Sequence, residues 1–153
     1  LYGPNDNFDL QTSHVLPAMM RKFHEAKESN HSDVTLWGSG SPMREFLYVD
    51  DLANAVVFAL ENVLPEHLYN VGTGVDATIK DLAETIQSQV GHNGKIVWDN
   101  TKPDGTPRKL MDSSKMMQLG WQPKYDLKNG IDNTYSWFLD NHKKLKKVKF
   151  EVK

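Results

Sequence analysis

Residues 34–55 constrain the fold most, because they predict a strand, a tight turn, a second strand and the start of a helix. The turn at 38–42, Gly-Ser-Gly-Ser-Pro, supplies glycines that accept positive φ and a proline that fixes its own φ. Phe46 and Tyr48 then alternate as in a strand, and Asp50 is expected to cap the following helix. Apolar residues continue at the helical period and predict its buried face: Leu52, Ala53, Val56, Val57 and Leu60.

Helical and strand patterns alternate along the rest of the chain. The predicted helices span residues 13–29, 50–62, 78–90, 112–119 and 126–141, and the predicted strands span 34–37, 43–49, 68–74 and 95–98. Ser13 is expected to cap the first helix, and Thr78 with Asp81 resembles a capping box. The predicted buried stripe of the first helix is Val15, Leu16, Met19, Met20 and Phe23. That of the helix 78–90 is Ile79, Leu82, Ala83, Ile86 and Val90. This alternation predicts an α/β fold.

The composition excludes several classes of protein. No apolar run approaches the about 18 residues of a membrane span, and a net charge of −2 argues against binding nucleic acid through bulk charge. The basic stretch 142–153 is short, and we interpret it as a solvated end. The absence of cysteine suits a reducing compartment. We therefore expect a cytoplasmic protein with no membrane and no nucleic-acid partner.

The chain opens on Leu-Tyr-Gly-Pro-Asn-Asp, without a methionine and in what resembles the end of a strand. A natural domain rarely starts in this way. We therefore interpret residues 1–153 as one domain, a fragment of a longer protein whose N-terminal part is absent.

A possible dinucleotide fingerprint follows the predicted strand 68–74. Gly72, Gly74 and Ala77 have the Gly-x-Gly-x-x-Gly/Ala spacing, and Asp99 lies at about the distance of a ribose-binding acid. The chain after Asp99 has no convincing strand to complete a doubly wound sheet, and Asp76 would bring a negative charge to the pyrophosphate site. We interpret the segment as an ordinary strand-to-helix turn.

Several motifs together carry a family resemblance. Those that resemble the C-terminal half of extended short-chain dehydrogenase/reductases lie at residues 1–4, 44–52, 69–74, 112–115 and 119–123. Those that more narrowly resemble the GDP-L-fucose synthase family lie at residues 7–18, 37–46 and 102–109. The resemblance covers nearly the whole chain, and its motifs agree in order and spacing.

The resemblance implies a two-part chemistry. The family epimerises C3 and C5 of GDP-4-keto-6-deoxy-mannose and then reduces the C4 ketone with NADPH, using a cysteine, a histidine and a Ser-Tyr-Lys set. This chain has no cysteine, and none of its tyrosines has a lysine four residues on. We therefore expect a small C-terminal substrate-binding domain whose N-terminal Rossmann domain is absent, and which alone is inactive. NADP(H) would be bound mainly by the missing domain, and the full-length enzyme would be a homodimer, whereas this fragment can be monomeric.

The resemblance also assigns roles to charged residues. His14 matches the proton-donating histidine and would also meet the cofactor; an imidazole near its ordinary pKa of about 6.5 can return a proton beside a ketone. Arg44 would bind the diphosphate through its permanently charged fork, joined by Lys109. The alternative for both cations is a surface ion pair with Glu45 or Asp51.

The remaining candidate residues would contact the substrate or the cofactor. Trp37 offers a ring wall, since an aromatic face near an arginine suits a nucleotide or a sugar, although it is equally compatible with the core. Asp104 lies in a loop that can bend over a ligand, or it simply forms a turn. Three further candidates are Lys22 as a substrate-binding charge, and Val15 and Met19 as an apolar floor under guanine. Leu1 would lie beside the cofactor.

Two alternatives stay open. A related nucleotide-sugar 4-epimerase or dehydratase would share the motifs around Arg44 and Gly72 but favour another nucleotide. A non-enzymatic module could instead bind a partner protein through the final amphipathic helix and the basic tail.

Overall fold

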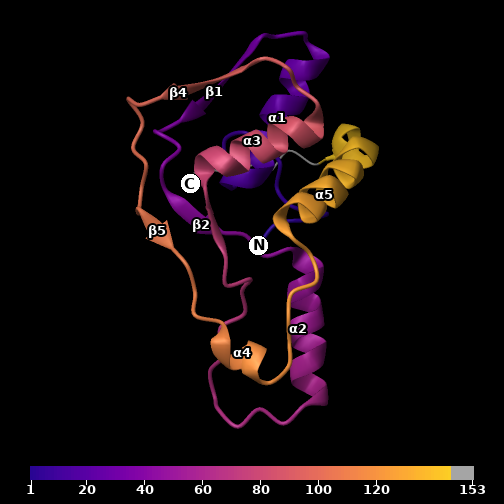
Figure 1. The fold of residues 1–153 in the computed structure, drawn as a ribbon. Coiled ribbons are helices and arrows are strands. Elements are labelled where there is room, and N and C mark those ends of the chain that lie inside the picture. Colours follow the sequence, from indigo (N-terminus) through magenta and orange to yellow (C-terminus); the bar gives the residue numbers. More distant parts are fainter. Residues whose placement is uncertain (146–153) are drawn as a thin grey trace, which may run out of the picture.

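A computed structural model describes residues 1–145 of the chain, in which helices and strands alternate (Figure 1). The helices are α1 (Val15–Glu28), α2 (Val49–Glu61), α3 (Ile79–Val90), α4 (Ser114–Gln118), α5 (Leu127–Asn141) and the short 3₁₀ helix η1 (His142–Lys144). The strands are β1 (Asp33–Trp37), β2 (Met43–Glu45), β3 (Asp76–Thr78), β4 (Lys95–Asp99) and β5 (Arg108–Lys109). The predicted α/β class is confirmed.

The strands form two small sheets. In one, β1 and β4 pair in parallel from Asp33↔Lys95 to Trp37↔Asp99. In the other, β2 is central: it pairs antiparallel with β3 and in parallel with β5. Because β2 leaves the turn that follows β1, the end of β1 lies close to this second sheet.

The main core lies where α3 packs against α1 and α5, at one end of the molecule (Figure 1). The predicted stripes of α1 and α3 both contribute to it, as expected for amphipathic helices. Its most deeply buried side chains, each at most 2% exposed, include Leu16, Met20, Phe23, Leu82, Ile86, Ile131 and Phe138. One member of the predicted stripe of α1, Val15, is instead 37% exposed.

A smaller core joins α2 and α4 at the other end (Figure 1). Trp121 is 2% exposed in it, and the indole N–H donates to Asn54 Oδ1 at 3.2 Å. The buried face of α2 was predicted wrongly: Asp51 and Ala55 are buried. Most of the expected stripe faces solvent, with Val56 53%, Val57 49% and Leu60 82% exposed. The buried Asp51 carboxylate fixes this orientation, because it bonds to the chain that leads into α5.

The helix caps divide into confirmed and wrong predictions. Thr78 and Asp81 form the predicted capping box, with Thr78 Oγ1 accepting from the Asp81 N–H at 2.9 Å. The caps predicted for Ser13 and Asp50 are wrong, because α1 begins one residue later and α2 begins two residues earlier than those caps require. Their N-cap residues are His14 and Tyr48, without side-chain hydrogen bonds.

Two strand predictions also differ from the structure. Residues 68–74 form no strand, and Leu68 is 77% exposed. The predicted strand 43–49 is limited to β2, after which Tyr48 forms only an isolated bridge with Tyr2.

No helix within residues 1–145 is long and apolar enough to cross a bilayer. Most of the basic stretch 142–153, which we interpret as a solvated end, lies outside the described residues.

Candidate functional site

A cleft of about 460 Å³ lies where the start of α1, the end of β1, β2 and the loop before β5 meet. Most of the predicted site residues line it: Leu1, His14, Val15, Trp37, Arg44, Asp104 and Lys109. The exceptions are Lys22 and Met19. Segments that are far apart in the sequence therefore converge on one concave surface. Its volume falls in the range of ordinary ligand pockets.

Two cations face each other across the strands of this cleft. The parallel register of β2 and β5 sets Arg44 directly opposite Lys109. The Arg44 Nη1 donates to the Met43 carbonyl at 2.7 Å, and neither cation forms an ion pair with a carboxylate of residues 1–145. Like charges at opposed positions repel unless an anion lies between them. The pair has the charge of a candidate anion site, and the alternative of surface ion pairs with Glu45 or Asp51 is wrong for residues 1–145.

Trp37 is 68% exposed, which excludes the alternative that it belongs to the core. The Nζ atoms of Lys22 and Lys102 lie 5.9 Å and 5.5 Å from its ring centroid, within the range of cation–π attraction. Lys22 Nζ also donates to the Thr35 carbonyl at 3.1 Å, and burial lowers the pKa of Lys22. Lys22 thus contacts the Trp37 ring and does not line the cleft.

Asp104 fastens its loop to the turn after β1. Its Oδ1 accepts from the Ser39 N–H at 2.6 Å and its Oδ2 from the Ser39 hydroxyl at 2.7 Å. These bonds hold the pKa of Asp104 below its usual range, and the bond from the Ser39 N–H has the larger effect. A side chain at Gly38 would clash with this carboxylate, since an added Cβ would lie 2.3 Å from Oδ1. Asp104 therefore shapes the cleft wall, and only its remaining lone pairs face a ligand.

The start of α1 supplies His14 and Val15, both exposed at the cleft. Because Val15 points to the cleft rather than into the main core, it offers an apolar surface to a ligand. Met19 is different, since it is 4% exposed, belongs to the main core and does not line the cleft. Its predicted place in an apolar floor is not seen.

The Gly72-Thr73-Gly74 turn is occupied by a carboxylate of the chain itself. Glu45 Oε1 accepts from the Gly74 N–H at 2.7 Å and from the Thr73 hydroxyl at 3.4 Å. The turn therefore has the donors of an anion site, but they serve Glu45. This agrees with rejecting the segment as a dinucleotide fingerprint.

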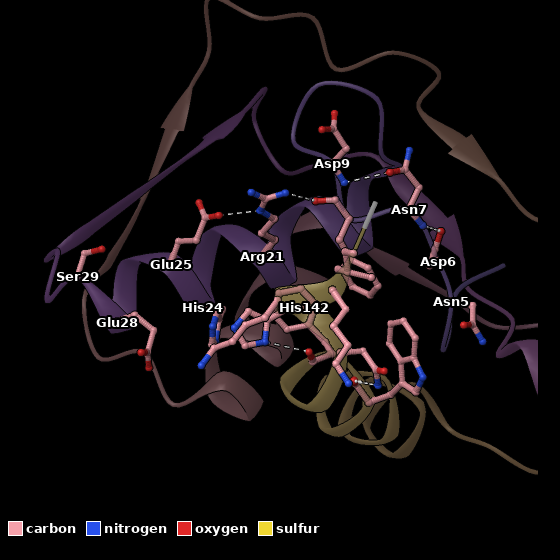
Figure 2. A pocket seen from close by; sticks show the side chains of 17 residues that line it. Asn5, Asp6, Asn7, Asp9, Arg21, His24, Glu25, Glu28, Ser29 and His142 are labelled. Carbon is pink, nitrogen blue, oxygen red and sulfur yellow. Dashed lines mark hydrogen bonds and ion pairs between the residues drawn. The ribbon is translucent and has the colours of Figure 1, made fainter. Parts of the chain in front are cut away.

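A larger cleft of about 890 Å³ lies between α1 and α5 (Figure 2). Figure 2 shows His24 and His142 close together in it, with Arg21 reaching toward Glu25. None of the predicted site residues lines this larger cleft. The smaller cleft is therefore the candidate site, because it alone holds the cation pair.

Sequence reasoning missed Ser39, Glu45 and Lys102. The hydrogen-bond partners of Ser39 and Glu45 lie 28 to 66 residues away, and Lys102 contacts the distant Trp37 ring. Local patterns do not encode such contacts. The sequence does show an acidic side chain, Glu45, directly after Arg44. On its own this indicates only a possible ion pair.

The chain is similar to known proteins over most of its length. The family model described as "NAD dependent epimerase/dehydratase family" matches residues 1–72. "Putative GDP-L-fucose synthase 2" of Arabidopsis thaliana is 61% identical over 141 residues, which are 92% of this chain and 43% of that protein. "GDP-L-fucose synthase" of Escherichia coli (strain K12) is 53% identical over 92% of this chain and 47% of that protein. This chain is a relative of the GDP-L-fucose synthases. The predicted family resemblance is confirmed.

Solved structures of GDP-L-fucose synthases and other nucleotide-sugar enzymes share the fold. A "gdp-l-fucose synthetase from Naegleria fowleri" superposes with a TM-score of 0.88 and 31% identity, covering 95% of this chain and 45% of that one. A UDP-glucose 4-epimerase of Thermotoga maritima, solved with UDP-glucose, gives a TM-score of 0.78 at 25% identity over 92% of this chain and 44% of that one. The chain spans less than half the length of curated GDP-L-fucose synthases from Arabidopsis thaliana and Oryza sativa that it matches.

Proposed function

We propose that residues 1–153 form the substrate-binding part of an NADPH-dependent 3,5-epimerase/4-reductase that makes GDP-L-fucose. The observation that carries the proposal is the pair Arg44 and Lys109, opposed on β2 and β5 without a carboxylate partner among residues 1–145. A diphosphate carries the paired oxygens and the charge that such a site lacks. The whole chain would be one domain, with the Rossmann domain of the enzyme in the missing N-terminal part.

The other groups of the cleft suit the rest of a GDP-sugar. The exposed ring of Trp37 offers a flat apolar wall to the base or the sugar. Asp104 could accept a hydrogen bond from a hydroxyl or an amine through the lone pairs that Ser39 leaves open. Val15 would contribute apolar contact, while Lys22 would act through Trp37, and Met19 would support α1 from the core.

His14 is the proposed acid of the epimerisation. A ketone at C4 acidifies the protons on C3 and C5, and an exposed imidazole at the cleft can return one of them. The relative from Naegleria fowleri has also been solved "bound to NADP". Leu1 and His14, which both line the cleft, would face this cofactor, which supplies a hydride to C4. The missing part would hold its pyrophosphate, because the Gly-rich turn of this chain already binds Glu45.

The location and the assembly of the protein are also proposed. We expect the full-length enzyme to work in the cytoplasm as a homodimer and the 153-residue chain to stay monomeric. Both expectations are independent of the argument from Arg44 and Lys109.

Calorimetric titration of the 153-residue chain with GDP, UDP and NADP⁺ tests the proposal. We expect GDP to bind more tightly than UDP and NADP⁺, and Arg44→Gln to weaken GDP binding at least tenfold, since a hydrogen bond to a charged group contributes about 1.5–3 kcal/mol. The control is Lys80→Gln, which removes one exposed positive charge from α3. No binding at millimolar GDP contradicts the proposal.

The same titration separates the alternatives. Preference for UDP would favour another nucleotide-sugar epimerase, the class of the structural relative from Thermotoga maritima. Absence of any nucleotide binding would favour the non-catalytic interaction module.

A further inference from the structure

We infer that Glu45 is a positioning residue, whose carboxylate holds Lys109 beside Arg44. This inference rests on the proposed function, because it concerns the same cation pair. Glu45 ends β2 and directly follows Arg44. Its contacts reach two segments that lie far away in the sequence.

The carboxylate of Glu45 joins a turn to the chain that leaves β5. Its Oε1 accepts from the Gly74 N–H at 2.7 Å and from the Thr73 hydroxyl, and its Oε2 accepts from the Met111 N–H at 3.3 Å. Met111 follows Lys109 by two residues. One side chain therefore fixes the position at which the Lys109 segment leaves the sheet.

The Lys109 segment depends on such attachments because its own strand is short. β5 pairs with β2 at only two positions, and residues 100–112 are all exposed. Before Lys109, Arg108 Nε donates to Asp76 Oδ2 at 2.5 Å. After Lys109, the Met111 N–H donates to Glu45 Oε2 and attaches the segment on that side. Lys109 thus lies between two residues, Arg108 and Met111, that bond to other segments. Loss of either bond would make the distance between Lys109 and Arg44 more variable.

The glycine at position 72 is explained by the same carboxylate. A Cβ added to Gly72 would lie 2.5 Å from Glu45 Oε1 and 2.8 Å from its carboxyl carbon. A substitution to alanine would push the carboxylate out of its place without changing any charge. Gly72 therefore gives a second way to disturb Glu45.

The sign of the effect separates positioning from simple charge. A carboxylate next to two cations repels an anion, so Coulomb's law predicts that Glu45→Gln strengthens the binding of a diphosphate. Positioning predicts the opposite, because the amide NH₂ of glutamine replaces one acceptor and releases one of the two clamped segments. The two accounts therefore differ in direction and not only in size.

The test is titration of the 153-residue chain with GDP, together with amide hydrogen exchange at Met111. We expect GDP binding to weaken about tenfold in both Glu45→Gln and Gly72→Ala, which corresponds to about 1.4 kcal/mol. We also expect faster exchange of the Met111 amide in both variants. Glu84→Gln on α3 removes one exposed carboxylate and is expected to stay within twofold of the original chain.

Combination with Lys109→Gln tests whether Glu45 acts through Lys109. In that background, Glu45→Gln is expected to change GDP binding by less than twofold, whereas a general loss of structure would weaken it again. Unchanged or tighter GDP binding in Glu45→Gln would overturn the inference. If the original chain binds no GDP, the proposed function fails, and unchanged Met111 exchange in both variants would still overturn the positioning role by itself.

Discussion

The carboxylate of Asp51 on α2 accepts a hydrogen bond from the backbone N–H of Tyr125, with 3.1 Å between Oδ2 and N. Its other oxygen accepts from the Lys124 N–H at 2.8 Å, and Asp51 is 1% exposed. One buried side chain therefore ties α2 to the segment that enters α5.

Removal of this carboxylate is expected to destabilise the fold. In Asp51→Ala, the N–H groups of Lys124 and Tyr125 lose their buried, charged acceptor, which costs about 2–4 kcal/mol of the free energy of unfolding. Urea denaturation followed by circular dichroism measures the change. Asp50→Ala, the exposed neighbour in the first turn, is the control and is expected to cost less than about 1 kcal/mol. Equal losses in both variants would contradict the anchoring role.

His24 makes the fold sensitive to pH. It is 7% exposed, its Nδ1 lies 3.1 Å from the Tyr135 hydroxyl, and its ring meets that of His142 with 5.0 Å between centroids. Burial lowers the pKa of His24 and the charge of His142 lowers it further, against the opposing effect of Glu28 and Glu25. The folded state therefore favours the neutral imidazole.

This lowered pKa gives a direction for the pH dependence. The unfolded chain binds more protons, so the contribution of His24 is fully present above its unfolded pKa of about 6.5. It is lost as the pH falls through that value toward the lower folded-state pKa. We expect the free energy of unfolding to fall less steeply between pH 7.5 and 5.5 in His24→Gln than in the original chain. His31→Gln, at an exposed side chain, should leave the slope unchanged; identical slopes in all three chains would contradict the prediction.

Substitutions on the exposed apolar face of α2 are expected to change the binding of a hydrophobic dye but not the free energy of unfolding. Because Val57 and Leu60 are 49% and 82% exposed, replacing both with glutamate should change the free energy of unfolding by no more than about 0.5 kcal/mol each. The same double variant should bind less of a hydrophobic fluorescent dye, since it divides a contiguous apolar patch. Leu139→Glu on α5, at a side chain 45% exposed, is the matched control, and an equal loss of dye binding there would contradict the prediction.

The proposed role of His14 is tested in the full-length protein. His14→Asn should greatly reduce the incorporation of solvent deuterium at C3 and C5, because the imidazole that returns the proton is gone. Reduction of a substrate that is already epimerised should stay comparatively intact. His67→Asn, in the exposed loop after α2, is the control. Equal loss of both steps in His14→Asn would contradict the assignment.

Local signals predicted the elements that local contacts stabilise. Thr78 and Asp81 are three residues apart, so the sequence alone predicts their capping box, and the stripe from Leu82 to Val90 follows from the helical period. The cleft residues were anticipated from motifs in separate segments, and the structure brings most of them together around Arg44.

Long-range contacts account for the errors. The apolar residues of α2 predicted the wrong buried face, because the bonds that Asp51 makes to residues 124 and 125 orient the helix. Residues 68–74 have strand-like composition, but their turn binds Glu45 and gives up sheet pairing. Met19 has the spacing of a cleft residue, yet it is buried in the main core, where α1 packs against α3.

The bonds between Asp104 and Ser39 have a thermodynamic consequence for any molecule that enters the cleft. They fasten the exposed loop before β5 while the protein folds, so the conformational entropy of that wall is already lost when a ligand arrives. Association would then cost mainly the ligand's own translational and rotational freedom. Fewer polar contacts would then be needed to reach a given affinity than with a loop that becomes ordered only on binding.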